Sequence, residues 1–133
     1  GRMLGIGANG KIGFNEPGSS LLSRTRVKTL TSKTRQDNAR FFDSLDEVPT
    51  HCLTQGLGTI LSAGTAFLFA FGANKADAVA AAVEGPLSAS CPASVLQMHE
   101  HAVIFADAAA ASKLTRTEYY RETWAAKPAW QLL

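Results

Sequence analysis

Apolar residues in this sequence fall into short runs that are separated by longer stretches of mixed character. The most apolar run reads TAFLFAF over residues 65–71 and lies between Gly64 and Gly72. A continuous apolar run of this length is typical of a parallel strand that is covered on both faces. Other apolar or β-branched runs predict further strands or extended segments at residues 2–6, 24–30, 52–57 and 102–106.

Helices are predicted in the stretches between these runs. Thr31 or Ser32 can cap a helix that continues over residues 34–42, with Ala39 and Phe42 on its inner side. Further helices are predicted over residues 58–63, 75–83 with Asn74 as the cap, 92–98, 107–113 and 116–127.

Strands that alternate with helices at these lengths predict an α/β fold. We expect a mostly parallel, Rossmann-like sheet with helices on both faces, within one domain that spans all 133 residues. The first apolar run is very short and the sequence begins at Gly1, so we expect the fold to be incomplete at its N-terminus. A sheet that lacks strands exposes apolar edges and faces.

Composition and charge narrow the class of function. The formal net charge of +2 is spread without a dense basic run, which argues against a nucleic-acid partner. No apolar segment has the length of a membrane-spanning helix, so no membrane partner is expected. Cys52 and Cys91 lack metal-ligand spacing and a CxxC motif, which favours reduced thiols in a cytoplasmic protein over a disulfide or catalytic thiol. His51 and His101 also lack ligand spacing, so no metal site is predicted.

The most unusual segment is the glycine-rich stretch GIGANGKIGFNEPGSS at residues 5–20. Its first three glycines have the G-x-G-x-x-G spacing of a dinucleotide-binding turn, in which the third glycine opens a helix and an acidic residue follows about 20 positions later. After Gly10, however, glycines and a proline exclude a helix, and no acidic residue occurs between Glu16 and Asp37. The sequence therefore does not predict a dinucleotide site.

This glycine-rich segment is instead expected to be a loop at the carboxyl end of a parallel strand, where open α/β sheets bind ligands. Glycines let backbone N–H groups approach a sugar or phosphate closely. The loop also carries Asn9, Lys11, Asn15 and Glu16 within a short span. A tight turn in which Glu16 is only hydrogen-bonded remains the alternative.

Several motifs, in order, carry a resemblance to a known family. The sequence GIGxNGxIGFNEPGSS is followed by SRTRVKTLT, TRxxNARFF, VPxxxLTxGLGTIL, GxNKAxAV, AxVEGP and PASxLQxH. This pattern, over about residues 4–124, resembles the C-terminal half of the glucosamine-6-phosphate deaminases, which have a NagB-like α/β fold. The resemblance implies a cytosolic enzyme of amino sugar catabolism that needs no cofactor. It would convert glucosamine 6-phosphate to fructose 6-phosphate and ammonia by isomerisation and deamination.

The resemblance also implies roles for residues of the glycine loop. In the family a histidine opens the sugar ring, supported by a carboxylate five residues later and by an Asp or Asn two residues before. Glu16 and Asn9 match the supporting positions, whereas Lys11 occupies the histidine position. An unperturbed histidine titrates at about 6.5 and a lysine at about 10.4, so Lys11 is a poor general base at neutral pH. We expect ring opening to be slowed or lost.

Two basic residues match the phosphate contacts of the family, Arg40 in NARFF and Lys75 in GANKA. An arginine offers a planar fork to phosphate and a lysine a point charge. Lys75 is expected in the first turn of a helix, where the helix dipole also favours an anion. A surface helix cation is the alternative for Arg40.

Other positions match an allosteric site for N-acetylglucosamine 6-phosphate, which occurs in some hexameric members. The matching residues are Ser19, Arg26 and Lys28, with Thr29 and Tyr119 as weaker candidates. Solvated charges at a strand edge are the alternative. His99, in the LQxH motif, is expected to be buried and hydrogen-bonded.

Three readings of function therefore stay open. The chain is part of an active deaminase, a non-catalytic sensor of hexosamine phosphates, or an inert remnant of a truncated gene. The proton-abstracting aspartate and the Ser/Thr-rich phosphate loop of the family belong to the missing N-terminal half, so we expect that half to be a required partner. A 6-phosphogluconolactonase-like hydrolase is the nearest rival within the fold.

Overall fold

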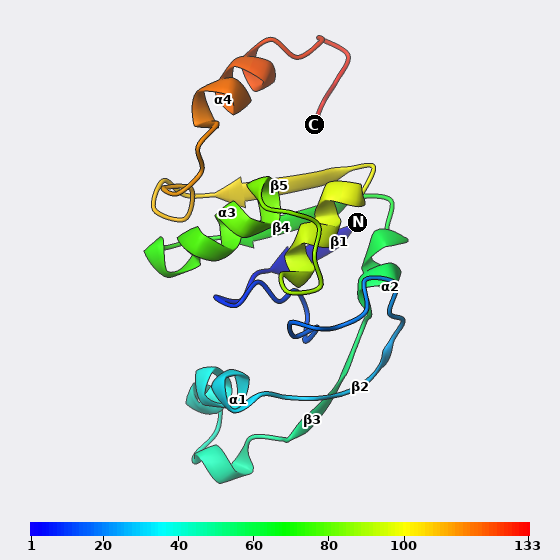
Figure 1. The fold of residues 1–133 in the computed structure, drawn as a ribbon, viewed down its shortest axis with the longest axis vertical. Helices are drawn as coiled ribbons and strands as arrows, with labels where there is room; N and C mark the ends of the chain where they lie inside the picture. Colours follow the sequence, from blue (N-terminus) through cyan, green and yellow to red (C-terminus); the bar gives the residue numbers. More distant parts are fainter.

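The computed structural model describes residues 1–133 and contains a parallel sheet of three strands (Figure 1). The strands are β1 (Arg2–Gly5), β4 (Ala66–Ala70) and β5 (Ala102–Ala106), in the order β1-β4-β5. All of these were expected from their apolar runs. They confirm the α/β fold class with a parallel sheet.

A second, antiparallel sheet is formed by β2 (Arg26–Thr29) and β3 (His51–Thr54), in which Val27 lies opposite Leu53. The prediction of strands near residues 24–30 and 52–57 is thus confirmed, but both strands lie outside the parallel sheet. A small helical unit connects them, made of α1 (Ser32–Asn38) and the 3₁₀ turns η1 (Ala39–Phe41) and η2 (Leu45–Glu47).

The α1 segment begins where its capping residue predicts. The Thr31 side chain accepts a hydrogen bond from the backbone N–H of Thr34, which satisfies one of the free donors at a helix start. The predicted helix over residues 34–42 ends earlier, because the backbone tightens into the 3₁₀ turn η1. Phe42 does not lie on an inner face, since it is 40% exposed.

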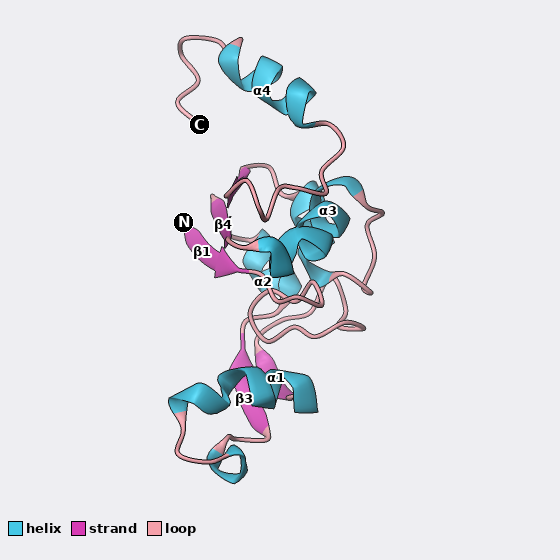
Figure 2. Cartoon of the chain, turned by 90° about the vertical axis from the view of Figure 1, so that its left-hand side faces the viewer, coloured by secondary structure: helices cyan, strands magenta, loops and turns pink.

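Helices pack on one face of the parallel sheet (Figure 2). Leu68 of β4 points to this face and is fully buried with Ile60, Val79 and Val95. The apolar core thus lies between β4 and the covering elements α2 (Leu57–Leu61), α3 (Ala76–Glu84) and the 3₁₀ segment η4 (Pro92–Met98).

The opposite face of the sheet carries exposed apolar side chains. Met3 is 75% exposed, Phe71 61% and Phe105 40%, and Phe105 stacks on Phe69 at a centroid distance of 5.0 Å. The prediction that residues 65–71 are covered on both faces is therefore wrong for this chain. The expectation that an incomplete sheet exposes apolar surface is confirmed.

Two local predictions near the end of β4 and β5 are also wrong. Residues 107–113 form turns and no helix, although the Asp107 carboxylate accepts a hydrogen bond from the Ala110 backbone N–H as a helix cap would. The same carboxylate also accepts from the backbone N–H of Gly72. Asn74 does not cap a helix, since it lies inside the 3₁₀ turn η3 (Ala73–Lys75) and the N-cap of α3 is Lys75.

The last helix, α4 (Thr117–Ala125), is attached through Glu84 of α3. The Glu84 carboxylate accepts hydrogen bonds from Thr115, from the Arg116 backbone and from the Tyr120 hydroxyl. These hydrogen bonds, chiefly that from the Thr115 backbone, lower the Glu84 pKa from 4.5 to about 2. No helix of the structure has the length and apolar character needed to cross a membrane.

Candidate functional site

The glycine loop folds back on itself at the carboxyl end of β1. The backbone N–H of Gly7 donates to the Lys11 carbonyl at 2.9 Å, and that of Gly10 donates to the Gly7 carbonyl at 2.9 Å. Gly10 has φ +85, and a Cβ there would lie 2.8 Å from the Cys91 sulfur. Only glycine fits this position without strain. The loop is therefore a compact turn whose shape depends on its glycines.

Glu16 is the centre of a buried polar cluster in this loop. It is 5% exposed, and its Oε2 accepts a hydrogen bond from the Asn9 side-chain amide at 2.8 Å. Its Oε1 accepts one from the Thr34 hydroxyl of α1 and lies 3.7 Å from the Lys11 Nζ. The structure thus brings together the three predicted residues Asn9, Lys11 and Glu16. It adds Thr34, which the motif had not singled out.

Lys11 is held as a hydrogen-bond donor by this cluster. Its Nζ donates to the Thr34 hydroxyl at 2.7 Å and lies 5.5 Å from the centre of the Phe14 ring. The Glu16 carboxylate lies 3.7 Å from the same Nζ and forms an ion pair with it. Lys11 therefore contributes a positive charge at the edge of the loop, and Glu16 faces it from the buried side.

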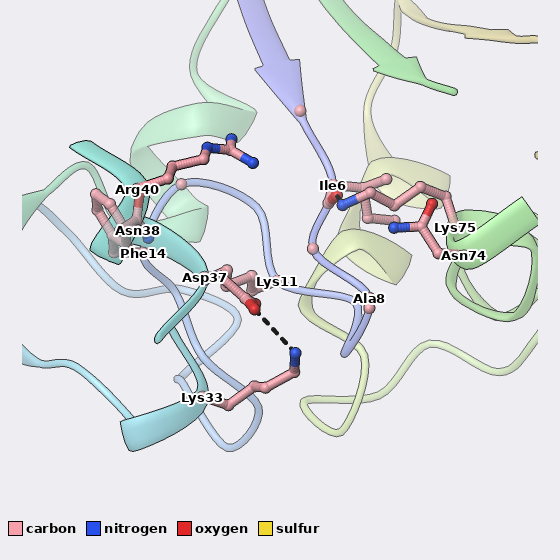
Figure 3. A pocket seen from close by; sticks show the side chains of 13 residues that line it. Ile6, Ala8, Lys11, Phe14, Lys33, Asp37, Asn38, Arg40, Asn74 and Lys75 are labelled. Carbon is pink, nitrogen blue, oxygen red and sulfur yellow. Dashed lines mark hydrogen bonds and ion pairs between the residues drawn. The ribbon is translucent and has the colours of Figure 1, made fainter. Parts of the chain in front are cut away.

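A cavity of about 410 Å³ lies beside this cluster, at the carboxyl end of β1 (Figure 3). Its charged lining consists of one carboxylate and four cations, Asp37, Lys11, Lys33, Arg40 and Lys75. Lys33 donates to Asp37 at 2.8 Å, and this hydrogen bond, with charge from Lys11 and Lys75, lowers the Asp37 pKa. The excess of cations makes the cavity suited to an anion.

Arg40 and Lys75 approach this cavity from opposite sides (Figure 3). Arg40 comes from η1, and its guanidinium has no hydrogen-bond acceptor in the chain and lies 4.7 Å from the Phe41 ring centre. Lys75 comes from η3 and donates to the Ile6 carbonyl at 2.7 Å. It is the N-cap of α3 and so precedes the first helical turn, in which it was expected. Both cations thus line one cavity, and their contact with a phosphate group stays a prediction.

The predicted effector residues do not form one cluster within the chain. Ser19 is buried and donates to the Glu16 carbonyl at 2.7 Å, and Arg26 donates to Asn15 Oδ1 at 2.6 Å. Lys28 and Thr29 lie on β2, whereas Tyr119 lies on α4, toward the other end of the molecule (Figure 1). Their role in effector binding stays a prediction.

The remaining thiols and imidazoles lie outside this site. Cys52 and Cys91 are free thiols, and burial raises the pKa of each. His99 is half-buried and its Nδ1 accepts a hydrogen bond from the His101 backbone N–H at 2.9 Å, so it is less buried than expected. His51 is exposed, and no group of three or more metal-ligating side chains occurs in the structure.

The fold is an α/β fold whose cation-lined cavity lies at the carboxyl end of a parallel strand, which is where open α/β sheets commonly bind ligands. The same fold occurs in the 6-phosphogluconolactonase of Trypanosoma brucei, with a TM-score of 0.59 over 85% of this chain and 41% of that one. That similarity shows the fold alone, because the two chains are 23% identical. A scan against protein-family models found no match.

The chain is similar in sequence and structure to the glucosamine-6-phosphate deaminases, the family that its motifs resemble. A monomeric glucosamine-6-phosphate deaminase, described as a missing link of the NagB superfamily, is 51% identical with a TM-score of 0.80, over 83% of this chain and 46% of that one. The deaminase of Rhodococcus opacus is 64% identical over 98% of this chain and 50% of its own length. That of Cutibacterium acnes is 67% identical over 92% of this chain and 47% of its own length. The chain thus spans about half the length of the curated relatives it matches.

Proposed function

We propose that the protein to which this chain belongs is a cytoplasmic glucosamine-6-phosphate deaminase of amino sugar catabolism. It would convert glucosamine 6-phosphate and water to fructose 6-phosphate and ammonia. The observation that carries the proposal is the cavity in which Lys11, Arg40 and Lys75 converge from three separate segments. The relatives that carry this name share 60–67% of the matched residues.

Charge complementarity indicates which residues would bind each end of glucosamine 6-phosphate. Arg40 has free guanidinium donors, and Lys75 keeps two protons beyond the one it donates to Ile6. These two cations suit the phosphate group. Lys11, Asn9 and Glu16 lie on the loop side of the same site and suit the sugar ring.

The proton transfer from C2 to C1 needs a base that this cavity does not provide. Its one lining carboxylate, Asp37, is half-exposed and already paired with Lys33, and Glu16 is buried behind Lys11. We therefore propose that the base comes from the other half of the full-length protein. The exposed apolar face around Met3, Phe71 and Phe105 suits packing of that half.

A non-catalytic sensor of hexosamine phosphates is the second candidate, because Lys11 is engaged by Glu16 and Thr34 in place of a neutral imidazole. The two candidates predict different effects of Lys11→His. In a deaminase with slowed ring opening this substitution raises turnover. In a sensor it leaves the protein inactive while glucosamine 6-phosphate still binds.

The finer points of regulation and assembly are also proposals. Ser19, Arg26, Lys28 and Thr29 would bind N-acetylglucosamine 6-phosphate as an effector, because they lie on or beside β2 near the loop. Tyr119 could join them only from another copy of the chain, as in a hexamer. A hyperbolic dependence of rate on substrate concentration, unchanged by this effector, would exclude the regulation.

The test of the function uses the full-length protein. Ammonia release from glucosamine 6-phosphate is measured beside calorimetric binding of the same sugar, with glucose 6-phosphate as the control that cannot release ammonia. Release of ammonia supports the deaminase, and binding without release supports the sensor. Absence of binding heat with either sugar phosphate would refute both candidates.

A further inference from the structure

Thr34 occupies a position in α1 where its hydroxyl is fully used. The residue is 1% exposed, and its Oγ1 accepts from the Lys11 Nζ at 2.7 Å and from the Thr31 hydroxyl at 3.1 Å. The same hydroxyl donates its proton to the Glu16 carboxylate. A hydroxyl group has one proton and two acceptor lone pairs, so every hydrogen-bonding capacity of Thr34 is satisfied.

Helix formation alone does not require this arrangement. The helix start is already capped, because the Thr31 side chain accepts from the Thr34 backbone N–H. The Thr34 side chain also reaches the glycine loop, 23 residues away at Lys11 and 18 at Glu16. An apolar side chain of the same shape would keep the helix and lose these contacts.

The contacts of Thr34 decide where the Lys11 charge lies. Lys11 lies 3.7 Å from the Glu16 carboxylate, which is beyond direct hydrogen-bond length, so the Thr34 hydroxyl is the atom that joins the two. A lysine side chain has four rotatable bonds and loses its fixed position when its partner is removed. Lys11 also lines the cation-rich cavity, so its position sets the field that a bound sugar phosphate experiences.

We propose that Thr34 is a positioning residue that holds the Lys11 ammonium at the wall of the sugar-phosphate cavity by bridging it to Glu16. This inference rests on the proposed function, since it assumes that the cavity binds the sugar phosphate. In this arrangement Thr34 itself does not contact the substrate. Thr34 affects the substrate only through the position of Lys11.

The test compares variants of the full-length protein that differ at the hydroxyl. Thr34→Val removes it and keeps the shape, whereas Thr34→Ser keeps it and removes a methyl group. Loss of the hydrogen bond to the Lys11 ammonium is expected to weaken glucosamine 6-phosphate binding about tenfold in Thr34→Val. Thr34→Ser is expected to stay within about threefold, and inorganic phosphate affinity within about twofold in both variants, because Arg40 and Lys75 are untouched.

A double-mutant cycle separates positioning from general damage to the fold. In a Lys11→Met background the Thr34→Val effect on sugar phosphate affinity is expected to fall below about twofold, because the group through which it acts is gone. If Thr34→Val does not fold, the comparison is made between Thr34→Ser and Thr34→Ala, which also differ by the hydroxyl. Thermal melting of each variant identifies the folded ones.

The outcomes are distinct. Equal affinity of Thr34→Val and the native protein overturns the inference, as does an undiminished Thr34→Val effect in the Lys11→Met background. Both results leave the proposed function standing. If the native protein binds inorganic phosphate but no glucosamine 6-phosphate, the proposed function fails and the role of Thr34 fails with it.

Discussion

The assignment of Arg40 and Lys75 to a phosphate group can be tested with a third cation of the same cavity as the control. The three substitutions Arg40→Met, Lys75→Met and Lys33→Met each remove one positive charge from the lining. The three cations differ in whether they already have a hydrogen-bond acceptor within the chain. Lys33 is paired with Asp37 and its side chain is 71% exposed, whereas Arg40 has no acceptor in the chain.

The expected magnitudes follow from these differences. A hydrogen bond to a charged group contributes about 1.5–3 kcal/mol, so losing the one that each phosphate-binding cation would make weakens affinity about 10- to 150-fold. Arg40→Met belongs at the upper end, because a guanidinium can bind phosphate with two parallel bonds. Lys33→Met removes an exposed, ion-paired charge and is expected to cost at most about fivefold.

The assay is calorimetric titration of the full-length variants with glucosamine 6-phosphate and with inorganic phosphate, at two salt concentrations. The affinities for both ligands should fall in parallel in the Arg40 and Lys75 variants, because the lost contact is to the phosphate group that the two ligands share. A loss in Lys33→Met as large as that in Arg40→Met would refute the reasoning. It would mean that the cavity attracts anions by its total charge and not through two defined contacts.

Three further predictions follow from other parts of the structure. Asp37→Asn removes the one carboxylate of the cavity lining, so inorganic phosphate is expected to bind up to about fivefold more tightly at low salt, by calorimetry, and the gain should shrink at high salt. The Glu84 pKa is lowered from 4.5 to about 2 by its hydrogen bonds with Thr115, Arg116 and Tyr120. The stabilisation from these hydrogen bonds is therefore complete above about pH 4.5 and is lost as the pH falls through about 2. Protection of the Thr115 amide, measured as exchange relative to its intrinsic rate at each pH, should therefore fall over that interval, and in Glu84→Ala it should already be low at neutral pH. Gly10→Ala forces a side chain into φ +85 and against a neighbouring sulfur, whereas Gly18→Ala meets φ +91 with no atom within 4 Å. Each substitution should cost about 1–2 kcal/mol of backbone strain and so lower the melting temperature, and Gly10→Ala should lower it further; equal melting temperatures would contradict the contact.

The sequence pattern was sufficient to predict the structure of those segments whose conformation depends on their own residues. The strands at residues 66–70 and 102–106 could be predicted because their apolar runs are continuous and bounded by polar or glycine residues. The helix start at Thr31 could be predicted because capping is a local hydrogen bond. The motif around Glu16 and Asn9 could be recognised because both residues lie in one loop.

Pattern was insufficient where contacts distant in sequence decide the structure. Residues 107–113 have helical composition, but Asp107 is bound to the backbone of Gly72, 35 residues away. The pairing of β2 with β3 as a separate antiparallel sheet could not be read from either strand alone. Thr34 looked like an ordinary helix residue, because nothing local indicates its contacts with the loop.

The proposed second half of the protein would account for two features of this molecule. One face of the sheet leaves Met3 and Phe71 exposed, although burial of such side chains stabilises a fold by about 1.5–3 kcal/mol each. The cavity holds four cations but no unpaired carboxylate that could remove a proton from carbon. Both features are accounted for if the other half of the protein packs against this chain, because the relatives of the chain are about twice its length. A segment that covers the apolar face and ends at the carboxyl edge of β1 would complete the core and supply the base at the same time.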